Sequence, residues 1–310
     1  MNFLRKCCKL FSVITSKDQI MLDLIVNPLA GGKNGKRMAK NLARIEKRLK
    51  ERKVEYAIHF TEKPKHAVEL TKTLIDNGAT VIVCVGGDGT LHEVVNGFHS
   101  FDKCALGIIP CGTGNDFAEA LKLEKDIDKA VDLILDGEAK YTDFIQLPTV
   151  RSINIVGMGI DVEVLKKYNA LKHKNKFGYT KCLLKTLFTY DYVKFTAETD
   201  GEKTEFKAFM ACVANGSSYG GGIRICPVAD ASDKNLDFVA VDKLSKPKIL
   251  GALLKLKGGK ILSLPQATHK KITKIKIEAE KPYVVQADGE LYSDIPFEAE
   301  IISDKLRIYR

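Results

Sequence analysis

Residues 81–97 read VIVCVGGDGTLHEVVNG, an apolar, β-branched run that leads through a glycine-rich turn into a helical pattern. Residues 81–85 predict a buried strand, and Thr90-Leu91-His92-Glu93 has the spacing of a capping box that opens a helix. Glycines let backbone N–H groups approach phosphate oxygens closely, and a helix N-terminus adds partial positive charge. The stretch predicts either a phosphate-binding turn, in which Asp88 holds a metal or orients phosphates, or a tight capped turn without a ligand.

The same alternation extends over the first half of the chain. Apolar runs at 22–26, 56–60, 80–85 and 105–109 alternate with helical patterns such as 38–53 and 66–76. This is typical of a doubly wound α/β fold, with a parallel sheet and helices on both faces. Two further glycine-rich turns, 27–32 and 110–116, follow strands. Three such turns are therefore expected at one sheet edge, which favours the phosphate-binding interpretation.

The pattern changes after about residue 140. Short alternating runs at 203–214, 236–241, 271–278 and 283–286 predict a mainly antiparallel sheet or β-sandwich, which helical stretches at 180–189 and 246–256 interrupt. We expect an N-terminal extension (1–20), an α/β domain (21–143) and a β-rich domain (144–310), and we allow the last strand to return to the first domain. Met21 is an alternative start, because a buried strand follows it at once.

Composition and charge narrow the class of protein. The chain has 310 residues, 49 Lys and Arg against 39 Asp and Glu, and a formal net charge of +10, so anionic partners are expected. No run reaches the roughly 18 to 20 consecutive apolar residues that a membrane span requires, and residues 1–20 lack the pattern of a secretory signal. The eight cysteines form no C-x-x-C pair, which favours reduced thiols in a cytoplasmic, soluble protein.

Three common motifs are incomplete in this sequence. The segment around Gly31-Gly32-Lys33 fails the Walker A pattern, because Ala30 and Arg37 stand where that pattern needs Gly and a hydroxyl residue. His92-Glu93 does not continue to a second His, since Asn96 occupies that position, so a zinc hydrolase is excluded. Residues 157–162 contain only part of a dinucleotide fingerprint and lie outside the βα region.

Several segments together point to a family. In the first half they are Asn27-Pro28 with Gly31, the run 86–97, and Pro110 with Gly112-Thr113-Gly114-Asn115-Asp116-Phe117-Ala118. These closely resemble the catalytic domain of diacylglycerol kinases and related lipid kinases. Residues 215–222 with Pro227, residues 230–233, and Asp288-Gly289-Glu290 are similar to the second domain of the soluble prokaryotic members. The resemblance covers nearly all of 21–310 and implies a first domain like that of NAD kinases and diacylglycerol kinases. The string GGDGT is shared with NAD kinases and sphingosine kinases, whereas NDFA and DGE indicate the lipid branch.

The resemblance implies a reaction and the residues that perform it. ATP is the expected phosphoryl donor, Mg²⁺ the cofactor, and a lipid hydroxyl the acceptor, with diacylglycerol as the first expectation. Glu290 is implied as the base that takes the hydroxyl proton, and Asp88 as the organiser of Mg²⁺ and phosphate. Without the resemblance, Glu290 would be read as a solvated hairpin carboxylate. The nucleotide is expected at Asn27, Pro28, Leu29, Ala30, Gly31, Thr61, Gly87, Asp88, Gly89, Thr90, Leu91, His92, Glu93 and Thr113.

Two other acidic segments are candidates. Asp116 stands at a helix start, where it is expected to act as an N-cap or in a catalytic or metal-linked role. Residues 230–235 resemble a structural Mg²⁺ loop with Asp230, Asp233 and Asn235 as oxygen ligands, which suit that hard cation. Many members of the family have Gly where this chain has Lys234, so a solvated acidic turn is a close alternative.

Lysines concentrate in two parts of the second domain: Lys166, Lys167, Lys172, Lys174, Lys176, Lys181 and Lys185, then Lys243, Lys246, Lys248, Lys255, Lys257 and Lys260. The second group interleaves with Ile249, Leu250, Leu253, Leu254 and Leu256, a basic amphipathic pattern that suits either an anionic bilayer or a solvated face. We expect a peripheral enzyme that docks on an anionic membrane and binds no nucleic acid, and we leave a homodimer open.

The sequence also allows other functions. Another lipid, such as a sphingoid base, a monoacylglycerol or a polyprenol, could be the acceptor, and a kinase of NAD or another soluble substrate shares the GGDGT turn. A non-catalytic module that binds nucleic acid through its basic surface lacks support, because no recognition helix or RNA-binding aromatic pattern accompanies the charge.

Overall fold

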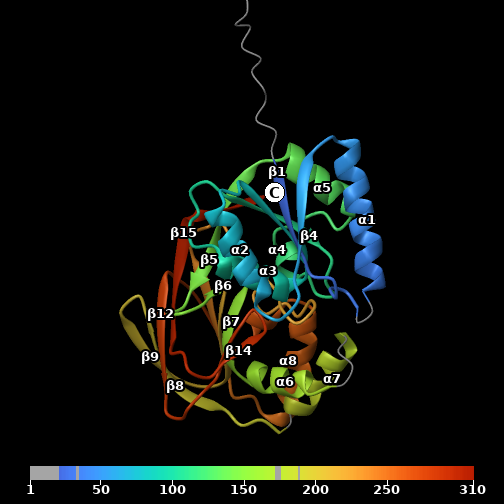
Figure 1. Ribbon diagram of the computed structural model, residues 1–310. Coiled ribbons are helices and arrows are strands. Elements are labelled where there is room, and N and C mark those ends of the chain that lie inside the picture. Colours follow the sequence, from blue (N-terminus) through green and yellow to red (C-terminus); the bar gives the residue numbers. More distant parts are fainter. Residues whose placement is uncertain (1–20, 33–34, 172–175, 188) are drawn as a thin grey trace, which may run out of the picture.

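The computed structural model describes residues 21–32, 35–171, 176–187 and 189–310. The predicted extension 1–20, with Cys7 and Cys8, lies outside the described residues. In the first half, β1 (Met21–Val26), β2 (Glu55–Phe60), β3 (Val81–Gly86) and β4 (Ala105–Pro110) form a parallel sheet in the order β2-β1-β3-β4. Figure 1 labels β1 and β4 of this sheet. The predicted doubly wound α/β fold is confirmed.

Helices cover both faces of this sheet. On one face, α1 (Lys36–Glu51) and α5 (Ile127–Asp136) share an apolar core with β1 and β3, to which Ile45 and Val131 contribute. On the other face, α2 (His66–Asp76) and α3 (Asp88–Gly97) pack through residues such as Ala67 and Val94, and the short helix α4 (Asp116–Ala120) joins them. Every residue of β3 and β4 is buried, which is why these strands read as continuous apolar runs in the sequence.

The second half forms a mainly antiparallel sheet that is continuous with the first through β15. Its strands are β5 (Ala139–Gln146), β6 (Arg151–Ser152), β7 (Ile155–Gly159), β8 (Val193–Thr199), β9 (Glu202–Ala214), β10 (Leu236–Asp242), β11 (Ala267–Ile272), β12 (Lys274–Ala279), β13 (Val285–Ala287), β14 (Glu290–Tyr292) and β15 (Phe297–Tyr309). Side chains from distant strands, including Phe195, Phe238, Ile275 and Phe297, meet in one core. The predicted second domain, a β-sandwich, is confirmed.

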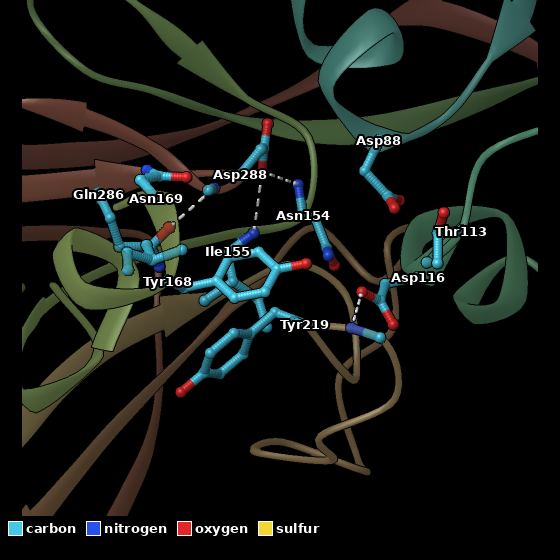
Figure 2. A pocket seen from close by; sticks show the side chains of 15 residues that line it. Asp88, Thr113, Asp116, Asn154, Ile155, Tyr168, Asn169, Tyr219, Gln286 and Asp288 are labelled. Carbon is cyan, nitrogen blue, oxygen red and sulfur yellow. Dashed lines mark hydrogen bonds between the residues drawn. The ribbon is translucent and has the colours of Figure 1, made fainter. Parts of the chain in front are cut away.

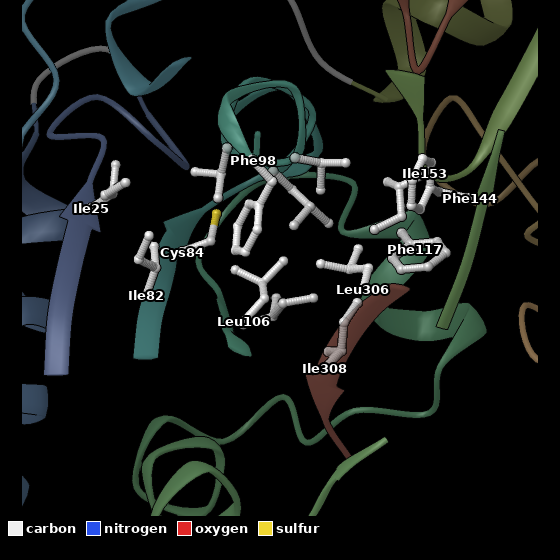
Figure 3. Close-up of a cluster of buried hydrophobic side chains, with 14 of the residues drawn as sticks. Ile25, Ile82, Cys84, Phe98, Leu106, Phe117, Phe144, Ile153, Leu306 and Ile308 are labelled. Carbon is white, nitrogen blue, oxygen red and sulfur yellow. The ribbon is translucent and has the colours of Figure 1, made fainter. Parts of the chain in front are cut away.

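Strand β15 connects the two halves. It pairs with β12 and β5 in antiparallel fashion, and near its end Ile308 lies beside Leu106 of β4 in parallel register. Figure 3 shows the result: Leu306 and Ile308 pack with Phe98 and Leu106 in one cluster of buried side chains. The two halves therefore share apolar core and cannot separate without exposing it.

Three longer helices lie against the second sheet: α6 (Ile160–Asn169), α7 (Lys176–Leu187) and α8 (Lys246–Lys257), the last followed by the 3₁₀ turn η1 (Ile261–Ser263) (Figure 1). Among the described residues, no helix is long and apolar enough to cross a membrane. The six cysteines in this part of the chain are buried and free.

One predicted strand, 271–278, is wrong. The predicted strand is interrupted at Thr273. The residues on either side of it belong to β11 and β12, which pair with different neighbours. The backbone N–H groups of Thr273 and Lys274 donate to the carboxylate of Asp200, at 3.2 and 3.1 Å. This side chain therefore replaces a ladder partner at the break, which apolar periodicity does not reveal.

Candidate functional site

The three glycine-rich turns meet at the carboxyl edge of the parallel sheet. A Cβ on Gly112 would lie only 2.4 Å from Cα of Gly87, so these two turns touch backbone to backbone. Gly31 has a φ of +76°, and a Cβ there would lie 2.7 Å from the carbonyl oxygen of Cys111. Only glycine permits these approaches. The predicted meeting of the turns is confirmed, and their glycines are required by contact between turns.

A groove of about 740 Å³ opens beside these turns. Its lining contains most of the residues predicted to surround a nucleotide, together with one residue of the second domain: Asn27, Pro28, Leu29, Ala30, Gly31, Thr61, Gly87, Gly89, Thr90, Glu93 and Glu290. Asn27 Nδ2 donates to Thr90 Oγ1 at 3.1 Å, and Thr61 N donates to the carbonyl of Val26 at 2.9 Å. These bonds hold three separate turns in one wall.

Four of the predicted residues lie elsewhere. Leu91 is buried in the core of the first domain, and His92 is buried and directed toward the second domain. Asp88 and Thr113 line a neighbouring pocket. The structure thus separates the predicted nucleotide set into a group along the groove and a group behind it.

The predicted capping box at Thr90–Glu93 is wrong. Helix α3 begins at Asp88, after Gly87 as N-cap, so Thr90 already lies within the first turn. The carboxylate of Glu93 instead accepts hydrogen bonds from the backbone N–H groups of Lys65 and Ala67, at 2.9 and 3.1 Å. Glu93 therefore caps the neighbouring helix α2, where the otherwise unpaired N–H groups of a helix start need an acceptor.

Figure 2 shows the second pocket, which has a volume of about 230 Å³ and lies between the two domains. Asp88, Thr113 and Asp116 come from the first domain, and the opposite side is formed by Tyr168, Tyr219, Gln286 and Asp288, among others. The turn between β13 and β14 joins the two cavities: Asp288 and Gly289 line this pocket, whereas the next residue, Glu290, lines the groove.

Asp88 and Asp116 hold loops in place at the boundary of this pocket. Asp88 accepts from the backbone N–H of Asn115 at 2.7 Å, and burial raises the pKa of its carboxyl group, although backbone hydrogen bonds partly compensate. Asp116 is the first residue of α4, so the predicted N-cap role is wrong: its carboxylate accepts from the N–H of Gly221 at 2.7 Å. Both carboxylates lie close to Gly114. A Cβ added to this glycine would be 2.6 Å from Asp88 Oδ2 and 3.2 Å from Asp116 Oδ2.

Asp288 is the main polar anchor of the site, and sequence reasoning assigned it no role. Its side chain is 2% exposed and accepts from His92 Nδ1 at 2.8 Å and from Ser152 Oγ at 2.5 Å. The backbone N–H groups of Ile153, Asn154 and Ile155 also donate to it, at 3.0 to 3.2 Å. Burial alone would raise the pKa of Asp288. The hydrogen-bond donors, of which His92 has the largest effect, outweigh burial and hold the pKa of Asp288 below its usual value.

The same network fixes the hairpin that carries Glu290. His92 Nε2 lies 2.9 Å from the hydroxyl of Tyr292, so one imidazole bridges Asp288 and Tyr292 on either side of the turn. Asp288 and Gly289 both have positive φ, as a two-residue hairpin turn between Ala287 and Glu290 requires. The available sequence signal was the Asp-Gly pair between two short strands.

The predicted metal loop at Asp230, Asp233 and Asn235 is organised by other contacts. Asp230 is exposed and accepts from the N–H of Ser232, and Asp233 accepts from the N–H of Asn235. The second oxygen of Asp233 forms an ion pair with Lys271 of β11. A lysine thus neutralises the Asp233 carboxylate, and occupancy of the loop by a metal stays a prediction.

Comparisons with known proteins agree with this architecture. The model of the family "Diacylglycerol kinase catalytic domain" matches residues 21–147, and that of the "YegS C-terminal NAD kinase beta sandwich-like domain" matches 154–310. "Putative lipid kinase YtlR" of Bacillus subtilis (strain 168) is 29% identical over 92% of this chain and 97% of its own length. "Diacylglycerol kinase" of the same organism is 28% identical over 89% of this chain and 91% of its own length. The crystal structure of a "putative diacylglycerol kinase" from Bacillus anthracis str. Sterne has a TM-score of 0.76 at 26% identity and covers 94% of this chain and 96% of that chain.

Proposed function

Because the chain belongs to the diacylglycerol kinase family, and is thus a kinase that phosphorylates a lipid hydroxyl, we propose that it converts diacylglycerol to phosphatidic acid with ATP and Mg²⁺. One observation carries the proposal. A single hairpin turn places Glu290 in the groove of the first domain and Gly289 in the pocket between the domains. A donor in the groove and an acceptor in the pocket would meet at this turn.

The groove suits the phosphates of a nucleotide. Its wall includes Gly87 and Gly89, which carry no side chain to obstruct a phosphate, and α3 begins between them at Asp88. The start of a helix favours negative charge, so it would stabilise phosphate groups without the lysine that a Walker A loop supplies. Asn27 and Thr90, which bond each other, keep the first two turns at a constant spacing.

Glu290 is placed to act as the base. Its side chain is exposed, while the hairpin on which it stands is fixed by the buried Asp288 network. Phosphoryl transfer depends mainly on positioning and charge stabilisation, so the base must orient the acceptor hydroxyl and receive its proton as the bond to phosphorus forms. A rigid turn with one exposed carboxylate meets that requirement.

Magnesium would supply charge neutralisation on the transferred phosphates when bound. Asp88 and Asp116 would hold it, because their carboxylates converge beside Gly114 and oxygen ligands are those that Mg²⁺ prefers. The absence of a side chain at Gly114 leaves the space between the two carboxylates unobstructed. In the protein itself these acids also position the 112–117 turn and the Gly221 loop.

The surroundings of the pocket favour a lipid acceptor over NAD. A small apolar cavity of about 50 Å³ lies between α6, α7 and α8, lined by residues such as Leu183, Phe209, Leu253 and Tyr219. Tyr219 also lines the pocket of Figure 2, so the two spaces are neighbours. Acyl chains would gain from burial beside such side chains, whereas the polar second half of NAD would not.

We further propose that the enzyme docks on an anionic membrane through α7 and α8. Both helices line the apolar cavity, and each carries an exposed leucine, Leu184 (42% exposed) on α7 and Leu254 (67%) on α8. Exposed lysines accompany them: Lys181, Lys185, Lys248 and Lys257, with Lys260 after α8. Apolar side chains among lysines are typical of surfaces that bind anionic bilayers, and the protein brings its site to a membrane-held substrate in this way.

The remaining lysines of the two predicted groups contribute less. Lys166, Lys167, Lys243 and Lys255 have partners within the protein, namely Glu163, Thr186, Asp191 and Ser263. Lys172 and Lys174 lie outside the described residues, as do the side chains of Lys176, Lys246 and Leu250. A homodimer and a cytoplasmic location remain predictions from the sequence.

The test is a phosphorylation assay with labelled ATP. The purified chain is given mixed micelles that contain diacylglycerol, a sphingoid base, a monoacylglycerol or a polyprenol, and NAD in a parallel reaction. We expect label in phosphatidic acid. Label in another lipid would replace diacylglycerol as the acceptor, and label only in NADP would contradict a lipid acceptor altogether.

Glu290→Gln tests the base. The amide keeps the shape of the side chain but cannot take a proton, so kcat should fall roughly 10²- to 10⁴-fold, while the KM for ATP stays close to that of the parent. Glu280→Gln, an exposed carboxylate before the same hairpin, serves as the matched control and should retain full activity. A Glu290→Gln variant with parental kcat would remove Glu290 from the mechanism.

A further inference from the structure

A second group of reactive side chains lies in the β-rich domain. Asp237 is the second residue of β10, and His269 belongs to β11, where it stands opposite Val239. Because side chains alternate along a strand, Asp237 and His269 lie on the same face of this pair. The loop before β10 brings Cys226 onto that face, where it packs in the same core as Val239.

The three side chains converge. One ligand atom from each of Cys226, Asp237 and His269 lies within 4.8 Å of those of the other two. His269 Nε2 is 2.6 Å from Asp237 Oδ1. The side chain of Asp237 is 1% exposed and Cys226 is fully buried, whereas the His269 side chain is 29% exposed and leaves a route from solvent.

One atom in this cluster lacks a partner. Asp237 Oδ2 is buried and makes no hydrogen bond within the described residues. Lys271 stands directly opposite Asp237 in the strand register, but its ammonium group pairs with Asp233. An unpaired buried carboxylate oxygen is unfavourable, and a cation between the three side chains would satisfy it.

We propose that Cys226, Asp237 and His269 bind a divalent transition-metal ion of the zinc type. Thiolate, carboxylate and imidazole are the ligands that Zn²⁺ and Co²⁺ accept, whereas Mg²⁺ and Ca²⁺ prefer oxygen alone. The charges balance, because one thiolate and one carboxylate neutralise a dication. On binding, the Cys226 S–H bond breaks, a sulfur–metal bond forms, and the proton passes to solvent.

Such a metal would connect a pocket loop to the sheet. Cys226 ends a segment that includes Tyr219 and Gly221, both of which line the pocket of Figure 2. That segment is held to itself by reciprocal backbone bonds between Tyr219 and Ile223 and by the bond from Cys226 N to the carbonyl of Ser217. A metal bound at Cys226 would fasten this loop to β10 and β11, so its role would be structural.

The experiment is a cobalt titration of the full-length, metal-stripped chain. We expect the near-ultraviolet absorption band of a thiolate–Co²⁺ bond, saturating at one ion per chain and lost when Zn²⁺ is added. Cys226→Ser should abolish the band, and His269→Gln should weaken Co²⁺ binding by more than about 100-fold, since even outer-shell changes reduce metal affinity by 10- to 100-fold. The double variant Cys7→Ser/Cys8→Ser removes the two thiols that are neighbours in sequence near the start of the chain. It is the control and should keep the band.

A measurement that keeps Cys226 guards against misfolding of the Cys226 variant. The zinc X-ray absorption spectrum of the Cys7→Ser/Cys8→Ser protein should show one sulfur neighbour at the metal. The proposal is overturned if no cobalt band forms, if Cys226→Ser retains it, or if the zinc spectrum shows no sulfur neighbour. In those cases the contact between Asp237 and His269 is a hydrogen bond without a metal. Kinase activity enters none of these readouts, so the result is independent of the proposed acceptor.

Discussion

Asp161 shows how a single buried group can dominate the pH dependence of stability. Its side chain borders the apolar cavity between α7 and α8, and neither carboxylate oxygen has a hydrogen-bond partner in the described part of the chain. Burial raises the pKa of Asp161 to about 7. The sequence shows only an acid near the start of a helix, which is a common position for a solvated carboxylate.

Asp161→Asn should therefore stabilise the protein in a pH-dependent way. Because the folded pKa is raised, the favourable contribution of the neutral acid is complete below about pH 4, the unfolded value, and is lost as the pH rises to about 7. At pH 8 the free energy of unfolding of the variant should be up to about 4 kcal/mol higher than that of the parent. Near pH 4 the two free energies should be similar. Urea unfolding at several pH values measures this difference.

Asp102→Asn, on an exposed turn, controls for the loss of one negative charge. It should shift the free energy of unfolding little, and by the same amount at every pH. A constant difference between Asp161→Asn and the parent from pH 4 to 8 would contradict the burial of an ionisable group at this position.

At the scale of elements, the hairpin β13–β14 depends on a contact with α3. His92 and Asp288 are 196 residues apart in sequence, yet both are buried, and His92 Nδ1 lies 2.8 Å from Asp288 Oδ2. The strands β13 and β14 have only three residues each, so the turn that carries Glu290 depends on side-chain contacts as well. Asp288 also binds Ser152 and the backbone N–H groups that follow it, and β13 pairs with β7. The hairpin is therefore fixed to both domains, and the His92 pair is its bond to the first.

Asp288→Asn should destabilise the protein and reduce catalysis. It replaces charge-assisted hydrogen bonds to His92, Ser152 and three backbone N–H groups by weaker ones, so we expect a loss of roughly 2 to 4 kcal/mol at pH 7. Because the folded pKa of Asp288 is lowered, its contribution is present above about pH 4 and disappears as the pH falls through the folded value. The deficit of the variant should shrink accordingly in acid, as measured by chemical unfolding.

The kinetic signature of Asp288→Asn separates positioning from binding. We expect kcat to fall while the KM for ATP changes little, because Asp288 lies outside the groove. Asp294→Asn, an exposed acid in the turn after β14, is the control and should behave like the parent. Equal effects of the two substitutions would show that the buried network has no special role.

At the scale of the whole molecule, the positions of the basic side chains decide where the net charge of +10 can act. In the first domain, α1 carries a ladder of arginines, Arg44, Arg48 and Arg52, but these pair with Asp128, Asp132 and Asp136 of α5. On α7 and α8, exposed lysines stand beside exposed leucines. We therefore propose α7 and α8, where charge and apolar side chains coincide, as the surface that meets an anionic membrane.

Reversing two of these charges should weaken membrane binding. Lys248→Glu/Lys257→Glu should reduce the partition of the enzyme into vesicles of anionic lipid by at least about 10-fold, because each lysine near such a surface contributes about 1 kcal/mol. Co-sedimentation at two salt concentrations measures the effect, which should diminish in high salt. Lys47→Glu/Lys50→Glu on α1, where both lysines are well exposed, is the matched control and should bind normally. Equal loss in both variants would favour a diffuse charge effect over a docking surface.

The sequence by itself determined the order of strands and helices in the first domain and the three glycine-rich turns at its sheet edge. Those features depend on local properties, namely apolar periodicity and the small size of glycine, which can be read without knowing the partners of any residue. It also predicted the change to short antiparallel strands. It did not predict the break at Thr273, because there the ladder partner is the side chain of Asp200.

Only the tertiary structure decided which polar side chains meet. Glu93 caps α2 rather than its own helix, His92 reaches Asp288 on a distant hairpin, and Lys271 takes the carboxylate expected to hold a metal. Each of these contacts joins residues from separate elements. The first lies within the α/β domain and the third within the β-rich domain, whereas the His92–Asp288 contact also depends on how the two domains pack around β15. The physical reason is that hydrogen-bond partners are set by distance in space, and residues far apart in sequence are brought together only when apolar surfaces are buried.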